Sequence, residues 1–130
     1  MNLLIVEDDV DTASFIQFVL EAENHTVRTA AAASEARRQL LDFAPDYIIL
    51  DRGLPDKDGV EFCRELRARP STANVPVLFL SAAKTDDEVA EGFSAGGDDY
   101  VTKPFSADQL LKRVQSLLPD LPGFLPGAWE

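Results

Sequence analysis

Short runs of apolar residues alternate along the chain with segments whose apolar positions recur at helical spacing. The runs predict five strands: Leu3–Val6, Thr26–Ala30, Tyr47–Leu50, Val77–Leu80 and Asp99–Thr102. Helical spacing predicts a helix after each strand, over residues 10–23, 34–43, 60–69, 85–95 and 107–118. Because strands that alternate with helices pair in parallel, the pattern predicts a doubly wound α/β domain with a five-stranded parallel sheet.

Residues at the helix ends support these boundaries. Asp9 and Ser106 are residue types that cap helix N-termini, and we expect them to cap the first and last helices. Gly92 lies inside the fourth predicted helix, where glycine costs about 1 kcal/mol relative to alanine. The composition changes to proline and glycine over residues 119–130, which predicts a linker or tail after a domain formed by residues 1–118.

Composition narrows the class of protein. A chain of 130 residues has the size of one domain, and its net charge of −11 argues against direct binding of nucleic acid. No apolar run is long enough to span a membrane, and the N-terminal residues lack the basic region of a secretion signal. A single cysteine, Cys63, cannot form an internal disulfide. We therefore expect a cytoplasmic protein that binds neither membrane nor nucleic acid through this segment.

Polar residues stand directly at the ends of four predicted strands. Glu7 and Asp8 follow the first strand, Asp51 the third, Ser81 the fourth and Lys103 the fifth. Because ligands of an open parallel sheet bind outside the carboxyl ends of its strands, we expect these side chains to meet at one edge.

Such a cluster has a definite chemistry. Three nearby carboxylates repel one another unless one is protonated or a cation lies among them, and oxygen ligands of this kind suit Mg²⁺. Lys103 adds a positive charge beside Asp51, and Ser81 adds a hydroxyl donor. A carboxylate in these surroundings can act as a nucleophile and form an aspartyl phosphate. Each residue alone is common as a cap or turn residue, so the prediction depends on their joint occurrence.

The sequence resembles the receiver domain of bacterial two-component response regulators over residues 2–118. The segments that carry the resemblance are Leu4–Asp9, Ile48–Pro55, Asp58–Gly59, Val77–Ala82 and Gly97–Phe105. The intervals between Asp8, Asp51, Ser81 and Lys103 also match that family.

The resemblance implies a flavodoxin-like (βα)5 fold with strand order 2-1-3-4-5. It also implies a signalling switch, and not a turnover enzyme, that assists its own phosphorylation and dephosphorylation. A histidine kinase or a histidine phosphotransfer protein would supply the phosphoryl group. Phosphorylation would change the surface around the fourth helix, fifth strand and fifth helix, and the output would be a domain after residue 118 or a separate target protein.

The resemblance also assigns the acceptor and the metal ligands. Asp51 is the expected phosphoacceptor. Asp8 would bind Mg²⁺ directly, Glu7 would act through water, and the Gly53 carbonyl and Asp51 would complete the protein ligands. Mn²⁺ could substitute for Mg²⁺.

Other residues would respond to the phosphoryl group. By resemblance, Ser81 and Lys103 bind it, and Tyr100 turns inward when Ser81 moves. The Lys103–Pro104 peptide bond is expected to be cis.

Some residues depart from the family pattern. Arg52, beside the acceptor, is often apolar or aromatic in relatives, and it would either aid docking of the phosphodonor or be solvated. Val89 and Ser94 stand where the DNA-binding subgroup has charged residues that pair across a dimer, which argues against that dimer.

Other functions fit the sequence less well. A Mg²⁺-dependent aspartyl-phosphate phosphohydrolase would carry a second Asp two residues after the nucleophile, where this chain has Gly53. A flavin-binding module would need a phosphate-cradling loop after the first strand, where Glu7–Asp9 would repel phosphate. A pseudo-receiver that switches without phosphate would usually have lost Asp51 or Lys103, and this chain keeps both.

Overall fold

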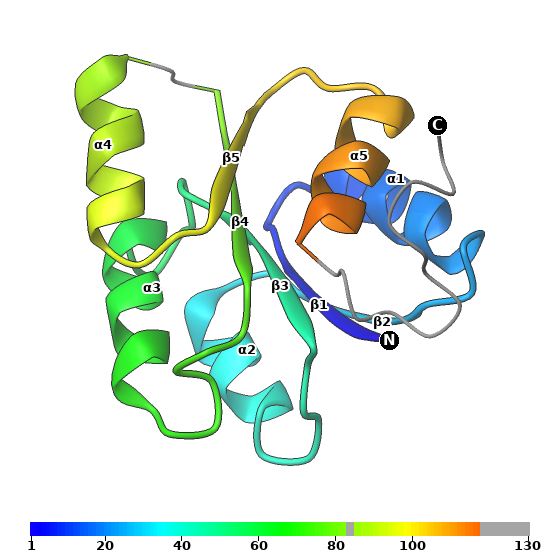
Figure 1. The fold of residues 1–130 in the computed structure, drawn as a ribbon. Helices are drawn as coiled ribbons and strands as arrows, with labels where there is room; N and C mark the ends of the chain where they lie inside the picture. The colour runs from blue at the N-terminus through cyan, green and yellow to red at the C-terminus, as the bar shows by residue number, and fades with distance from the viewer. Residues whose placement is uncertain (83–84, 118–130) are drawn as a thin grey trace.

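The computed structural model describes residues 1–82 and 85–117. Over these residues, strands and helices alternate along the whole chain (Figure 1). The elements are β1 (Asn2–Val6), α1 (Val10–Glu21), β2 (Thr26–Ala30), α2 (Ala33–Gln39), β3 (Tyr47–Asp51), α3 (Gly59–Ala68), β4 (Val77–Ser81), α4 (Asp86–Ser94), β5 (Asp99–Thr102) and α5 (Ala107–Ser116). The predicted tail, residues 119–130, lies outside the described residues.

The strands form one parallel sheet in the order β2-β1-β3-β4-β5. This confirms the predicted doubly wound, flavodoxin-like sheet. Helices α1 and α5 cover one face, and α2, α3 and α4 cover the other (Figure 1). The carboxyl ends of all five strands therefore lie along one edge, which we call the carboxyl edge, and the amino edge lies opposite.

Alternate residues of the central strands supply two apolar cores. On the α1–α5 face, Leu3, Ile5 and Ile49 are fully buried against residues of those two helices. On the other face, Leu4 and Ile48 are buried against residues of α2 and α3. Burial on both faces explains why the strands appear in the sequence as nearly continuous apolar runs.

Helix caps lie where the sequence places them. The Asp9 side chain accepts a hydrogen bond from the Thr12 amide at the start of α1. Ser106 and Gln109 form a reciprocal capping box at the start of α5. Both predicted caps are confirmed. A cap can be predicted from the sequence because it depends on residues only three positions away.

The second helix is shorter than predicted. It ends at Gln39, and Phe43, which was expected on its inner face, lies beyond it. The amides of Leu41 and Asp42 donate to the carbonyls of Arg38 and Gln39, three residues back, so the chain tightens into a turn after Gln39. Phe43 is still buried, with the Arg28 guanidinium 4.6 Å from its ring centre. The apolar pattern therefore predicts its burial correctly but not its secondary structure.

Candidate functional site

The carboxyl edge of the sheet gathers the polar residues that the sequence singles out. Glu7 and Asp8 directly follow β1, Asp51 and Ser81 are the last residues of β3 and β4, and Lys103 directly follows β5. The parallel register sets Asp51 beside Leu80, one residue before Ser81. The parallel topology thus brings together the ends of four strands that are far apart in the sequence.

Three carboxylates meet at this edge. One oxygen from each of Glu7, Asp8 and Asp51 lies within 4.8 Å of the others. Glu7 and Asp51 are 2% and 5% exposed, whereas Asp8 is exposed to solvent. Buried like charges this close are unstable as a set, so the site favours either a proton or a cation. All-oxygen ligands with an open solvent side fit a hard divalent ion that keeps several waters, such as Mg²⁺.

The crowding of acids at this edge changes the pKa of Glu7. Burial, with the neighbouring Asp51 carboxylate, raises the pKa of Glu7 from 4.5 to about 7, and the Lys103 ammonium only partly opposes this. A carboxyl group whose pKa lies near neutrality takes up a proton when no cation is close. The cluster is therefore an electrostatically frustrated site, in which the acids lack enough positive charge.

Lys103 is the cation that faces the acids. Its ammonium pairs with Glu7 and lies 3.5 Å from a carboxylate oxygen of Asp51. Burial alone would lower the pKa of Lys103, but the hydrogen bond with Glu7 and the charge of Asp51 outweigh burial and raise that pKa. The amide of Lys103 donates to the Ser81 carbonyl at 2.8 Å, and the Lys103–Pro104 peptide bond is cis.

Ser81 and Tyr100 lie on neighbouring strands. Ser81 is 6% exposed, and Tyr100 is partly buried on β5. The Tyr100 ring is tilted against the Phe79 ring, with 6.1 Å between their centres. A Cβ added to Gly92 of α4 would lie 3.3–3.4 Å from ring atoms of both residues, so both rings pack directly against α4.

The loop after Asp51 is held close to the strand. The Gly53 amide donates to the Asp51 carboxylate at 3.3 Å. Gly59, the first residue of α3, passes so near that a Cβ there would lie 2.4 Å from the Asp51 carbonyl oxygen. Only glycine allows this approach, so α3 begins directly behind the end of β3.

Two residues of this loop have roles that the sequence did not reveal. Asp56 accepts hydrogen bonds at 2.9 Å from the amides of Ala33 and Ser34, and so caps α2 from 22 and 23 positions away. Arg52 crosses to α4, and its side chain is only 14% exposed. The interpretation of Arg52 as a solvated side chain is therefore wrong. The partners of Asp56 and Arg52 cannot be predicted from neighbouring residues in the sequence, because they depend on how separate elements pack.

Comparison with known proteins places this fold and site in a class. The family model of the response regulator receiver domain matches residues 3–115. The chain belongs to the receiver-domain family of response regulators, which is a family of signalling proteins. No helix within residues 1–82 and 85–117 has the length and apolar character needed to cross a membrane.

Two transcriptional regulators are among its relatives. The chain is 40% identical over 117 residues to the phosphate regulon transcriptional regulatory protein PhoB of Rhizobium meliloti, covering 90% of this chain and 52% of that protein. It is 39% identical over 118 residues to the virulence transcriptional regulatory protein PhoP of Salmonella typhimurium, covering 91% and 52%. The chain thus spans about half the length of the curated relatives it matches.

Solved structures give the same family. A putative response regulator from Chloroflexus aurantiacus superposes with a TM-score of 0.85 at 38% identity, covering 90% of this chain and 96% of that one. The receiver domain of the sensor histidine kinase PA1611 from Pseudomonas aeruginosa, with a magnesium ion coordinated in its active-site cleft, gives 0.80 at 30% identity over 88% and 94%.

Proposed function

We propose that this chain is a phosphorylation-activated switch that takes a phosphoryl group onto Asp51. The observation that carries the proposal is the cluster of Glu7, Asp8 and Asp51 within 4.8 Å, faced by Lys103 at 3.5 Å from Asp51. A carboxylate nucleophile needs charge neutralisation on the incoming phosphoryl group more than it needs a general base. The geometry supports that function.

The transfer balances without any further reactant. A carboxylate oxygen of Asp51 attacks phosphorus of the donor phosphohistidine, the P–N bond breaks as the P–O bond forms, and the leaving imidazole takes a proton from solvent. Lys103 would leave its pairing with Asp51 for a phosphoryl oxygen, and the Ser81 hydroxyl would donate to another.

Glu7, Asp8, Asp51 and the Gly53 carbonyl would hold Mg²⁺, or Mn²⁺ in its place. When bound, the ion supplies positive charge to the transferring phosphoryl oxygens. The fit of the ligand set rests on its oxygen chemistry and on the raised pKa of Glu7, which marks a shortage of positive charge at the carboxyl edge. Asp8, the exposed member, leaves a side open for water and donor.

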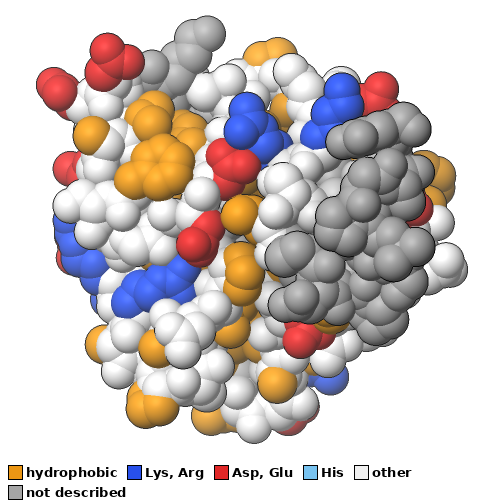
Figure 2. Space-filling model, in the orientation of Figure 1, with side chains coloured by type: hydrophobic (Ala, Val, Ile, Leu, Met, Phe, Trp, Pro, Cys, Tyr) orange, Lys and Arg blue, Asp and Glu red, His pale blue; other side chains and the backbone are white. Residues whose placement is uncertain are grey.

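The response would pass from Ser81 and Tyr100 to the surface formed by α4, β5 and α5. A groove of about 450 Å³ lies on this surface, lined in part by Val89, Phe93 and Tyr100. Figure 2 shows the same side of the molecule, where apolar side chains lie among acidic and basic ones. A shift of Tyr100 would change the wall of this groove and so alter what binds there.

The partners follow from the same proposal. A histidine kinase or histidine phosphotransfer protein in the cytoplasm would donate the phosphoryl group. The match covers 52% of each of these relatives, which are named as transcriptional regulators, so the output would be an attached domain or a separate target protein.

Mass spectrometry tests the acceptor directly. After treatment with acetyl phosphate and Mg²⁺, under conditions that preserve acyl phosphates, the wild type should carry one added phosphate, and Asp51→Ala should carry none. An unmodified wild type would overturn the proposal and favour a phosphate-independent binding module. Steady turnover of phosphate esters would instead favour a phosphohydrolase, although Gly53 stands where that class needs an acid.

Amide hydrogen exchange tests the switch separately. A beryllofluoride mimic of the phosphoryl group should change exchange over residues 85–100 in the presence of Mg²⁺. No change there would remove the switching claim and leave the phosphorylation claim standing.

A further inference from the structure

Arg52 connects the end of β3 to α4 by two contacts. Its guanidinium donates to the Glu88 carbonyl oxygen at 2.6 Å and pairs with the Glu91 carboxylate. Glu88 and Glu91 are one helical turn apart, so the two contacts fix both the height and the rotation of α4. The Arg52 side chain is 14% exposed and the Glu91 side chain 51%, so solvent reaches the ion pair mainly from the glutamate side.

The base of this connection is rigid. The Arg52 amide donates to the Leu80 carbonyl of β4 at 2.9 Å, and the Arg52 carbonyl accepts from the Gly59 amide of α3 at 2.9 Å. Arg52 also directly follows Asp51 in the chain. Any displacement at the acceptor therefore reaches the guanidinium through fixed backbone and not through a flexible loop.

Helix α4 has little apolar burial to hold it otherwise. Among its residues, Asp86–Ser94, only Gly92 is buried, and glycine contributes no side chain to the core. An interior glycine also weakens the helix by about 1 kcal/mol relative to alanine.

The C-terminal end of α4 is held more firmly than the rest of the helix. The C-terminal end is held where Arg67 of α3 donates to the Gly96 carbonyl at 2.7 and 3.0 Å. The rest of the helix depends on a few contacts, and the Arg52 pair is the charged one that leads to the acceptor loop.

We infer that Arg52 is a positioning residue that holds α4 in its unphosphorylated conformation. This inference rests on the proposed function. A phosphoryl group on Asp51 places new negative charge one residue from Arg52 and competes with Glu91 for the guanidinium. Movement of α4 would require both Arg52 contacts to break. The strength of these contacts would therefore set how often the helix moves, both after phosphorylation and by thermal fluctuation without it.

Glu91→Gln tests the inference without altering any group at the carboxyl edge. In the full chain with Mg²⁺ and no phosphodonor, amide exchange over residues 86–95 should become about two- to fivefold faster, the effect of removing the charge from a half-exposed ion pair. Arg52→Lys keeps the charge but not the fork that reaches both partners, so its exchange should lie between wild type and Arg52→Ala. Glu61→Gln is the matched control, because Glu61 pairs with Arg64 on the surface of α3.

The response to beryllofluoride separates positioning from simple stabilisation. If Arg52 holds only the unphosphorylated conformation, Glu91→Gln should speed exchange in the free protein and leave the mimic-bound protein unchanged, so the difference between the two shrinks. Equal acceleration in the free and mimic-bound proteins, or wild-type exchange in both Glu91→Gln and Arg52→Ala, would overturn the inference. Mass spectrometry of the same samples after acetyl phosphate keeps the two claims apart, since it reports phosphorylation whatever α4 does.

Discussion

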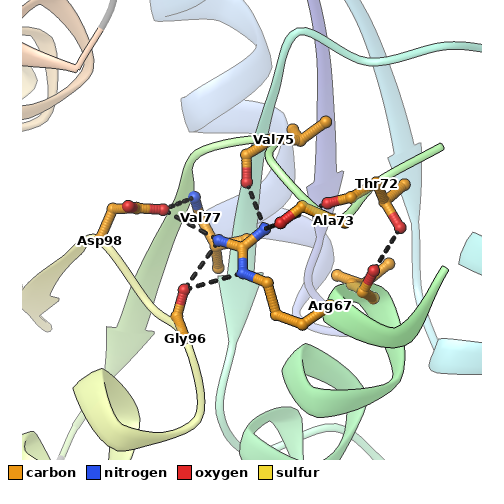
Figure 3. Close-up of polar contacts among 8 residues, drawn as sticks. Arg67, Thr72, Ala73, Val75, Val77, Gly96 and Asp98 are labelled. Atoms are coloured by element: carbon orange, nitrogen blue, oxygen red, sulfur yellow. Dashed lines mark hydrogen bonds and ion pairs between the residues drawn. The ribbon is translucent and has the colours of Figure 1, made fainter. Parts of the chain in front are cut away.

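The two edges of the sheet treat charge in opposite ways. At the amino edge, the Arg67 guanidinium donates to the carbonyls of Thr72, Ala73 and Val75 at 2.7–3.3 Å, to that of Gly96, and to the Asp98 carboxylate at 2.9 Å (Figure 3). One cation thus meets a full set of acceptors. At the carboxyl edge, three carboxylates lie close together, and the ammonium of Lys103 pairs with two of them, Glu7 and Asp51.

The satisfied edge is also closely packed. Gly96 has a φ of +107°, and a Cβ there would lie 2.8 Å from the Arg67 side chain, so glycine serves both the turn and the arginine. Asp98 accepts a second hydrogen bond, from the Val77 amide, and Thr72 donates to the Leu66 carbonyl at 2.6 Å. The amino edge therefore joins α3 to the loops that precede β4 and β5.

This contrast indicates that the contacts of the amino edge stabilise the fold, whereas the carboxylates of the carboxyl edge destabilise it when no cation is bound. At the amino edge the charge of Arg67 is matched by several acceptors. Interactions at the carboxyl edge are incomplete, and the shortage of positive charge is what a divalent ion can relieve. Four substitutions test the contrast, in order of decreasing effect on stability.

Arg67→Met should cost the most. It leaves several carbonyls and the Asp98 carboxylate without their donor, which should lower the free energy of unfolding by about 3–5 kcal/mol. Urea denaturation measures the loss. Arg64→Met is the control, since its pair with Glu61 is exposed and should be worth less than about 1 kcal/mol. Equal losses in the two variants would show that the amino edge is not the stabilising one.

Glu7→Gln tests the frustrated edge through its pH dependence. Because the folded pKa of Glu7, about 7, lies above its ordinary 4.5, the protonated form is favoured by folding. Its contribution is fully present below pH 4.5 and is lost as pH rises through 7, a loss of about 2–3 kcal/mol without metal.

Urea denaturation in a chelator, repeated across this pH range, should show the decline in wild type and a flatter profile in Glu7→Gln. Added Mg²⁺ should restore much of the wild-type stability at the upper end of the range, because the ion replaces the proton. The same decline in both proteins would contradict the assignment to Glu7. Glu61→Gln, on the exposed face of α3, should keep the wild-type decline.

The two edges also differ in how far the sequence predicts them. The residues of the carboxyl edge each end a strand, so the alternation of apolar runs is enough by itself to locate Asp51, Ser81 and Lys103. The caps at Asp9 and Ser106 are equally local.

Contacts between distant elements could not be predicted in this way. Arg67 and Gly96 are 29 positions apart, and Arg52 and Glu88 are 36 apart. A charged residue on a helix surface has the same local pattern whether it is solvated or bridges two elements. The predicted end of α2 was wrong for a related reason. The apolar pattern indicates that Phe43 is buried, and a side chain can be buried from a turn as well as from a helix.

Glu65→Gln gives the converse of the Glu7 experiment in the same residue type. The Arg37 guanidinium, bonded at 2.5 and 2.9 Å, and the Lys57 ammonium at 2.8 Å lower the pKa of Glu65 to about 2. Its contribution is present above pH 4.5 and is lost as pH falls through 2. Since the site is partly open to solvent, the substitution should cost about 1–2 kcal/mol at neutral pH. The gap from wild type should close in acid, and a gap constant with pH would refute the pairing.

Tyr47→Phe should have the smallest effect, and it probes a buried polar group at the amino edge that has no partner among the described residues. Tyr47, the first residue of β3, is fully buried, and its hydroxyl has no hydrogen-bond partner within the described part of the chain. Burial, with the nearby Asp99 and Asp98 carboxylates, raises the pKa of that hydroxyl, so it stays protonated. Removing an unsatisfied buried hydroxyl should stabilise the protein by up to about 1 kcal/mol, measured by thermal and urea unfolding. A loss of stability would mean instead that the hydroxyl is satisfied in solution.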